Sequence, residues 1–556
     1  MSATSSVGRI PKTAKDLYRG YIPPNLPQNR PPNKIKWWWK VEGRPRVTLY
    51  PKKEIEGYSE FAEYPPLNDG SRKGLKNQIR YDWYETIKGK STVEEKLLEI
   101  NRHQLHYMAH IPNWLPAYNS LPMAQYLTQT NLISKLPESY RISVDGDPDQ
   151  DRLDAQLVKQ MRQIILDQVA FDKYECPKKR NIGYVAKPIK QTSRNVYISN
   201  RFIQNLVSSI KRYLATQVNE QLLDYQCDLS PTIRSWWYHS GFEPPNNKIF
   251  YRNRKDDDGN INQMIQMDGF SSLNMRHDNF IEPIISRTDP IVTDLSLVQK
   301  LDSPLKFYGA RFKFRWPVTL PGFWYNDERS HLLDCPHTCF LSTDCLQARR
   351  KISHNIANPL NDDENCLNGQ AILTAYSWLN SLSMYHGYTP FQELDYPFTC
   401  QVVTTDGQNW LFNVYQLNNH VFHRDLGGPK SNNICWTSGL LRLFEEYKDG
   451  EFKGINDDVV KLIIRFFAQK TSSEYTSQLN LRPLLKADTR TEEERCKQEK
   501  RLRDTFEARI DKRAPHDWRV PLWEHIFFRS KENRDRITHM KPRWKRPKPK
   551  ISRFFQ

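Results

Sequence analysis

The distribution of charge is the feature of this 556-residue chain that most constrains its fold. Residues 1–53 hold 12 Lys and Arg against 2 Asp and Glu, and residues 482–556 hold 23 against 12. Residues 54–481 hold 47 basic and 50 acidic side chains and are nearly neutral. Because like charges repel, the two ends resist compact folding, whereas the neutral stretch is long enough to bury a core. We therefore predict a folded body at 54–481 between two extended basic arms, 1–53 and 482–556.

Basic arms on a neutral body are typical of proteins that bind nucleic acid. The alternative, that the arms are solvated tails that raise solubility, stays open at this stage. Nine cysteines in a long chain without a secretory signal indicate reduced thiols. The apolar runs are much shorter than the ~20 residues that a membrane-spanning helix needs, so no membrane span is predicted.

The N-terminal arm is rich in proline around a tryptophan triplet, "GYIPPNLPQNRPPNKIKWWWKVEGRPR". Proline fixes φ and lacks a backbone N–H, which argues against helix or central strand here. Aromatic faces among cations suit base stacking with phosphate pairing, and docking of the tryptophans in an apolar groove is an equal alternative. The candidate RNA-binding residues of this arm are Lys34, Lys36, Trp37, Trp38, Trp39 and Lys40. Residues 1–15, which contain no acid, also have the composition of an organellar presequence.

The C-terminal arm, 482–556, is predicted to begin as a charged helix and to end as an extended tail. Three prolines keep the tail extended, so its cations cannot gather on one helix face. On RNA, each phosphate contact releases counterions, which offsets the entropy lost when the tail is ordered. The candidate phosphate-binding residues are Lys541, Arg543, Lys545, Arg546, Lys548, Lys550 and Arg553, with Trp544 suited to base stacking or to a protein pocket. An unbound solubility tail is the alternative.

Hydrophobic periodicity predicts several amphipathic helices in the body. The first begins at a capping box formed by Ser91 and Glu94 and extends to Met108. The others are predicted at about 151–170, 200–222, 366–385 and 457–469.

Strand signals are local. "FTCQVVTTDGQNWLFNVYQL" has two β-rich runs around Asp406-Gly407, which predicts a hairpin whose two turn residues both have positive φ. The fold class predicted for the body is therefore α+β, with mixed helices and antiparallel strands.

The string "ARFKFRWPV" alternates cations with aromatics, as a strand with two different faces does. The aromatic face is predicted to contact the core, and the cationic face is a candidate surface for backbone phosphates or an ordinary solvated face. The cations are Arg311, Lys313 and Arg315, and the aromatics are Phe312, Phe314 and Trp316.

The string "HRDLGGPKSNN", 423–433, begins like the catalytic loop of a protein kinase, in which Asp425 would be the base. The metal-binding Asn should follow five residues later, but that position is Lys430, and Asn432 comes two residues too late. No D-F-G, A-P-E or Gly-rich kinase loop accompanies it. In "GGPKS" Pro429 occupies the position of the P-loop Gly before Lys430, and the first Gly of that motif is missing. We therefore predict a polar loop and no phosphotransfer.

Two groups of potential zinc ligands are present. His103, His106 and His110 are predicted to share a helix face, but no nearby carboxylate would orient their rings. The second group lacks the paired C-x₂-C spacing of a zinc site, so reduced core or loop cysteines are predicted, with zinc as the less favoured alternative at both places. Its members are Cys335, His337, Cys339, Cys345, His354 and Cys366.

Four strings occur in the order found in one family of mitochondrial ribosomal proteins. They are "STVEEKLLEINRHQLHYM", "QVVTTDGQNWLFNVYQLN", "NNICW" and "KGINDDVV". The chain thus resembles, over roughly 90–480, the family assigned to the mitochondrial large subunit as protein sixty-five. The same family is also called small-subunit protein thirty or programmed cell death protein nine.

The resemblance implies a structural constituent of the mitochondrial large ribosomal subunit in the matrix, without catalytic residues or cofactor. It also implies contacts with large-subunit rRNA and with other large-subunit proteins, including the related protein thirty-seven. A mitochondrial RNA-processing or nucleotide-dependent enzyme is the alternative from another functional class.

Overall fold

The computed structural model describes residues 85–479, with breaks, and residues 491–493. The breaks are 88, 104–105, 115–119, 141–154, 176–190, 218–219, 243–260, 300, 302–310, 324–333, 354–361 and 480–490. All described residues belong to one unit of the chain, Asn68–Leu522. The predictions for the 1–53 arm and for nearly all of the 482–556 arm lie outside the described residues.

Four of the predicted helices are confirmed, α5, α6, α10 and α11. The amphipathic character predicted for α10 is wrong, because this helix is buried on all sides. The α-helices are α3 (Val93–His103), α4 (Ser120–Leu127), α5 (Ala155–Val169), α6 (Gln191–Gln217), α8 (Pro290–Thr293), α9 (Asp344–Ser353), α10 (Asp363–Tyr385), α11 (Asp457–Ala468) and α12 (Ser473–Gln478). Single π or 3-10 turns occupy Glu138–Tyr140 (η2), Ala170–Glu175 (η3), Glu220–Asp224 (η4), Leu295–Leu297 (η5) and Arg424–Leu426 (η7).

The predicted helix at 91–108 is only partly correct. Its capping box is formed by Thr92 and Glu95, one residue later than predicted: the Glu95 N–H donates to Thr92 Oγ1, and the Thr92 N–H donates to the Glu95 carboxylate. The helix ends at His103, and a strand begins at His106. That strand pairs on both sides, and these tertiary ladders override the local helical pattern.

The strands form two main sheets, which we call sheet A and sheet B. Sheet A has the order β7 (Arg311–Arg315), β1 (His106–Pro112), β5 (Ile261–Phe270), β4 (Thr232–Phe242), β8 (Leu320–Pro321). Sheet B has the order β2 (Thr130–Ile133), β12 (Asn433–Arg442), β11 (Asn409–Leu417), β10 (Phe398–Thr405), β9 (Cys335–Ser342), β6 (Leu273–His277), β3 (Gln226–Leu229). A separate hairpin joins β13 (Glu446–Lys448) and β14 (Glu451–Lys453). Most neighbours are antiparallel, but β1–β5, β9–β10 and β2–β12 are parallel, so the body is α+β with mixed sheets.

The predicted hairpin is confirmed, because β10 and β11 pair antiparallel up to Thr405 and Trp410. The predicted turn geometry is wrong: Gly407 has φ +94°, whereas Asp406 is not among the residues with positive φ. Instead, the Asp406 carboxylate accepts hydrogen bonds from the backbone N–H groups of Gln408 and Asn409, at 2.9 and 2.7 Å. The side chain thus closes the turn without a second left-handed residue.

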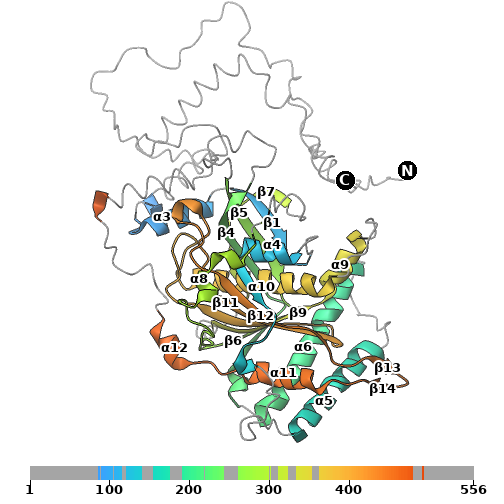
Figure 1. Ribbon diagram of the computed structural model, residues 1–556. Helices are drawn as coiled ribbons and strands as arrows, with labels where there is room; N and C mark the ends of the chain where they lie inside the picture. The colour runs from blue at the N-terminus through green and yellow to red at the C-terminus, as the bar shows by residue number, and fades with distance from the viewer. Residues whose placement is uncertain are drawn as a thin grey trace, which may run out of the picture. The chain divides into compact units, whose positions relative to one another are not determined.

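Helix α10 lies between the two sheets, and every residue from Cys366 to Ser383 is buried. One apolar cluster combines its side chains with those of α4, sheet A and one face of sheet B. A second cluster packs α5, α6 and α11 on the opposite face of sheet B, and α3 packs on sheet A beside Met108 and Trp236. Figure 1 shows this order, with α10 between sheet A above and sheet B below and with α5 and α11 beneath.

The polar side chains of α10 bond to both sheets. Asn380 donates to Ser235 Oγ of sheet A at 2.6 Å. Asn368 Oδ1 accepts from Asn413 Nδ2 and Thr437 Oγ1 of sheet B, both at 2.9 Å. These bonds compensate for the desolvation of the amides and fix the helix relative to both sheets.

Helix α4 crosses α10 at Gly369. A Cβ added at Gly369 would lie 2.8 Å from the backbone carbon and oxygen of Ser120. Real Cβ atoms do not approach backbone so closely, so the absence of a side chain at Gly369 permits this crossing.

We expect Gly369→Ala to lower the free energy of unfolding by about 1–3 kcal/mol, because a methyl group forced against backbone displaces α4 from α10. Gly89→Ala is the matched control, since its added Cβ would meet only ordinary contacts at 3.5 and 3.6 Å. Urea denaturation measures both variants. Equal stability of the two variants would show that the crossing tolerates a side chain.

Candidate nucleic-acid interface

Most predicted RNA-binding residues belong to the arms. Those outside the described residues are Lys34, Lys36, Trp37, Trp38, Trp39, Lys40, Lys541, Arg543, Trp544, Lys545, Arg546, Lys548, Lys550 and Arg553. The three remaining candidates, Arg311, Lys313 and Arg315, lie on β7, which is the edge strand of sheet A.

Strand β7 forms as the alternating sequence predicts. Its residues Arg311, Lys313 and Arg315 pair with His110, Met108 and His106 of β1. Trp316 comes directly after the strand and has an exposed fraction of 54%. The expectation that this aromatic side chain faces the core is therefore wrong, because the strand ends at Arg315, before the alternation reaches Trp316.

Four strands of sheet A bring their polar side chains together at Asp268 of β5. Arg315 Nη1 lies 2.8 Å from Asp268 Oδ2, and Arg234 of β4 pairs with the other carboxylate oxygen. His110 Nε2 of β1 lies 2.5 Å from Oδ2, and Gln266 Nε2 lies 3.2 Å from Oδ1. We call Asp268, His110, Arg234 and Arg315 the Asp268 cluster.

The Asp268 cluster carries more positive than negative charge at its exposed side. Burial alone would raise the pKa of Asp268, but the hydrogen bond from His110 and the charge of Arg234 lower it to about 2. The two guanidinium groups share this single carboxylate, and their side chains are 30% and 32% exposed. Since a guanidinium has five N–H donors, each retains donors that can reach a phosphate.

The predicted histidine face does not exist, because His103 ends α3 whereas His106 and His110 lie on β1. His110 instead belongs to the Asp268 cluster. Throughout the described part of the chain, no group of three or more His, Cys, Asp or Glu residues is arranged to hold a metal ion.

The cysteines of the second potential zinc group are buried and free in the body: Cys335, Cys339, Cys345 and Cys366. Burial raises the pKa of Cys335 and Cys339, which favours the neutral thiol over the thiolate that binds metals. His337 is also buried and its Nε2 contacts the Gln469 carbonyl at 3.2 Å. His354 lies outside the described residues.

The kinase-like string folds into a loop that is fixed by its two asparagines. Asn433 Oδ1 accepts from the backbone N–H groups of Asn418 and Asn419 at 2.7 and 2.9 Å. Its Nδ2 donates to the carbonyls of Thr128 and Asn419 at 2.7 and 2.9 Å. Both donors and both lone pairs are thus used inside the fold.

The Asn432 side chain also makes hydrogen bonds inside the fold. Its Oδ1 accepts from Gln129 Nε2 at 2.9 Å, and its Nδ2 donates to the Asp294 carbonyl at 2.6 Å. Lys430 pairs with Glu393. These residues position backbone segments, as expected for a structural loop.

A family model described as "Mitochondrial 28S ribosomal protein S30 (PDCD9)" matches residues 40–471. The chain belongs to this PDCD9 family. Membership makes it a mitochondrial ribosomal protein and indicates a structural role in translation. The matched range includes both sheets and the loop that Asn432 and Asn433 fix. No helix within the described residues of this PDCD9-family chain is long and apolar enough to cross a membrane.

The sequence predicted the strand with Arg315 but not the Asp268 cluster. Asp268 is a lone acid in the β-rich run "INQMIQMDGF", and Arg234 is a lone base in "TIRSWWYHS". A charged residue inside an apolar strand signals a buried ion pair, because an unpaired charge there is unfavourable. A lone charged residue does not show which residue it pairs with, since the strands that bring the two together are far apart in sequence.

We expect Asp268→Asn to lower the free energy of unfolding by about 1–3 kcal/mol at pH 7, because two guanidinium groups lose their shared carboxylate. Partial exposure of both arginines keeps the loss below that of a fully buried pair. Asp458→Asn is the control, since its carboxylate is 64% exposed and its ion pair is with Lys461, three residues further along α11. Urea denaturation at pH 7 compares the two, and a control as damaging as Asp268→Asn would contradict a special role for the cluster.

Stability should also fall as the pH is lowered from about 6.5 to about 4. Burial lowers the pKa of His239, His337 and His420 from 6.5 to about 4. Between these values the unfolded chain binds protons that the folded chain does not, so stability is full above 6.5 and is lost as pH falls through 4. Each histidine contributes up to about 3 kcal/mol to this loss of the free energy of unfolding. Protonation of the Asp268 carboxylate adds a further loss, but only when the pH falls below the ordinary pKa of 3.8. Chemical denaturation across this pH series measures the slope, which His337→Gln should reduce.

Proposed function

We propose that this chain is a structural constituent of the large subunit of the mitochondrial ribosome. In this proposal its basic arms bind rRNA and its body binds neighbouring ribosomal proteins. The observation that carries the proposal is the separation of charge, with cationic arms at 1–53 and 482–556 attached to a near-neutral, self-contained body. Membership of a mitochondrial ribosomal protein family supports the ribosomal part.

The assignment to the large subunit rests on the family resemblance of the sequence. The description of the matching family names the 28S subunit, which is the small subunit, so it does not support this assignment. The same resemblance supports pairing with the related protein thirty-seven. Locating the chain in separated subunits tests the subunit assignment, and crosslinking to protein thirty-seven in the assembled particle tests the pairing.

The arms suit rRNA because their cations and aromatics match phosphates and base faces. The tail places seven Lys and Arg within residues 541–553, with no acid among them. Each of these cations that reaches a phosphate releases counterions, which drives binding at low salt.

The Asp268 cluster offers a second rRNA contact, on the body. Asp268 holds Arg234 and Arg315 close together, and both side chains are one-third exposed. Trp316 presents an exposed ring directly after Arg315. A pair of fixed guanidinium groups suits a backbone phosphate, and the exposed Trp316, next in the sequence, suits a stacked base.

The alternative of a nucleotide-dependent enzyme finds no support in the kinase-like string. Asn432, which would be the magnesium ligand, uses its side chain for Gln129 and the Asp294 carbonyl. Lys430, which would approach a phosphate, pairs with Glu393.

We expect the full-length chain to co-sediment with the large subunit in sucrose gradients of mitochondrial lysate at moderate salt. Recovery with the small subunit would contradict the subunit assignment, and recovery only at the top of the gradient would contradict the ribosomal role. Binding of the full-length chain and of a chain lacking 541–556 to mitochondrial rRNA fragments, measured over a salt series, tests the tail. If about five cations reach phosphates, a chain lacking 541–556 should show a salt slope on rRNA that is lower by roughly three to five units. An unchanged slope would leave the tail as a protein-docking or solvated segment.

A further inference from the structure

Three large aliphatic side chains are exposed within the segment 290–297, which comprises α8 and the η5 turn. Ile291, Leu295 and Leu297 have exposed fractions of 38%, 37% and 46%, while Val292 between them is fully buried. Single exposed apolar residues are normal on a protein surface, but three within seven residues of one segment form a local apolar patch.

The segment is held in a fixed shape by hydrogen bonds. The Asn432 backbone N–H donates to the Val292 carbonyl at 2.7 Å, and the Asn432 side chain donates to the Asp294 carbonyl at 2.6 Å. Within the segment, the Asp294 carboxylate accepts from the Ser296 N–H and hydroxyl at 3.0 and 2.6 Å. A surface that is already rigid loses little conformational entropy when it binds a partner.

The charge of the segment indicates what kind of partner it fits. Asp289 and Asp294 place carboxylates at the start of α8 and of η5, beside the aliphatic side chains. Carboxylates repel phosphates, and aliphatic side chains have no π-face on which a base can stack. An apolar pocket bordered by Lys or Arg complements both features.

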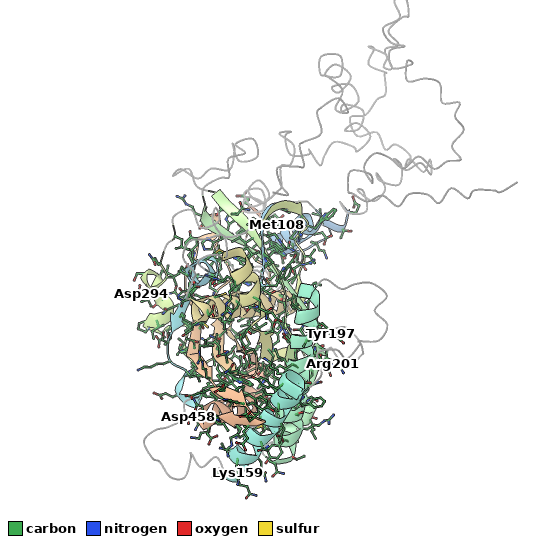
Figure 2. All side chains as sticks on the ribbon, turned by 90° about the vertical axis from the view of Figure 1, so that its right-hand side faces the viewer. Met108, Lys159, Tyr197, Arg201, Asp294 and Asp458 are labelled. Atoms are coloured by element: carbon green, nitrogen blue, oxygen red, sulfur yellow. The ribbon has the colours of Figure 1, made fainter. Side chains whose placement is uncertain are left out.

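The segment also lies where a partner can reach it. Figure 2 shows Asp294 at the edge of the body, on the side away from Tyr197 and Arg201 of α6. The mixture of exposed aliphatic side chains and carboxylates differs from the arginine-rich Asp268 cluster, which suits RNA.

We propose that residues 290–297 form a docking surface for a neighbouring ribosomal protein that presents an apolar pocket bordered by basic side chains. The inference rests on the proposed function and adds the surface and the chemistry of one partner. Asn432 is the positioning residue, since it holds the segment through both its backbone and its side chain.

A photo-crosslinking amino acid placed at Leu297 of the full-length chain tests the proposal in assembled mitochondrial ribosomes. The matched control carries the same group at Leu223 of η4, which is 61% exposed. We expect position 297 to crosslink to one other ribosomal protein, at a site with apolar and basic side chains, and position 223 not to crosslink there. A crosslink from position 297 to rRNA, to another part of this chain or to nothing in particles that contain the chain would overturn the inference.

A second measurement uses the combined Leu295→Ser and Leu297→Ser substitutions. Because both side chains are exposed, the variant should unfold at the temperature of the wild-type chain. We expect the crosslinked partner to be retained about tenfold less after a salt wash, because two leucine side chains lose the apolar surface that they would bury against it. The Leu223→Ser control should retain it fully, and equal retention by both variants would refute the docking surface. If the full-length chain is absent from ribosomes, the proposed function fails together with this inference. If the chain is present but position 297 contacts RNA, only this inference fails.

Discussion

The fold depends on satisfying the polar side chains of a helix that is buried on every side. Helix α10 has sheet A on one side and sheet B on the other, and eighteen consecutive residues are removed from solvent. Apolar packing alone discriminates weakly between alternative positions of such a helix, whereas Asn368 and Asn380 bond to specific strands. An unpaired amide there would be strongly unfavourable, so the same bonds that stabilise the core also select one arrangement of the two sheets.

The body and the arms divide two physical tasks. The body uses amides such as Asn432 and Asn433 to fix segments distant in sequence, and residues 54–481 are nearly neutral. The arms concentrate the positive charge that long-range attraction to a polyanion requires. In the proposed function, the body occupies one place in the ribosome while the cationic arms contact rRNA.

Part of this architecture could be predicted from the sequence. Helices α5, α6 and α11 follow from apolar periodicity, because each buries one stripe in the core. Helix α10 is buried on its whole circumference, so its sequence has no single apolar stripe. The β10–β11 hairpin follows from local turn residues. Predictions that depended on contacts between segments far apart in the sequence were less successful. His106 and His110 fit a helix until β5 and β7 pair with their strand.

The Asp268 cluster and the Asn432 contacts could not be predicted for the same reason. Asp268 meets Arg315 from a strand 47 residues away, and Asn432 meets Gln129 across 303 residues. Sequence patterns identify a lone acid in a strand or an asparagine pair in a loop. They do not identify which surface each will meet, since that is decided by the sheet order.

The parallel pairing of β2 with β12 has a consequence for how the chain matures. Asn433 is paired with Thr130, and the Asn433 side chain also bonds to the Thr128 carbonyl. The edge of sheet B at β2 therefore stays without its neighbour until some three hundred later residues have emerged and folded. Contacts of such long sequence separation form slowly. A chain interrupted before Asn433 is left with α4 and β2 but without the strand that completes them, so this side of sheet B forms only after β12 has been made.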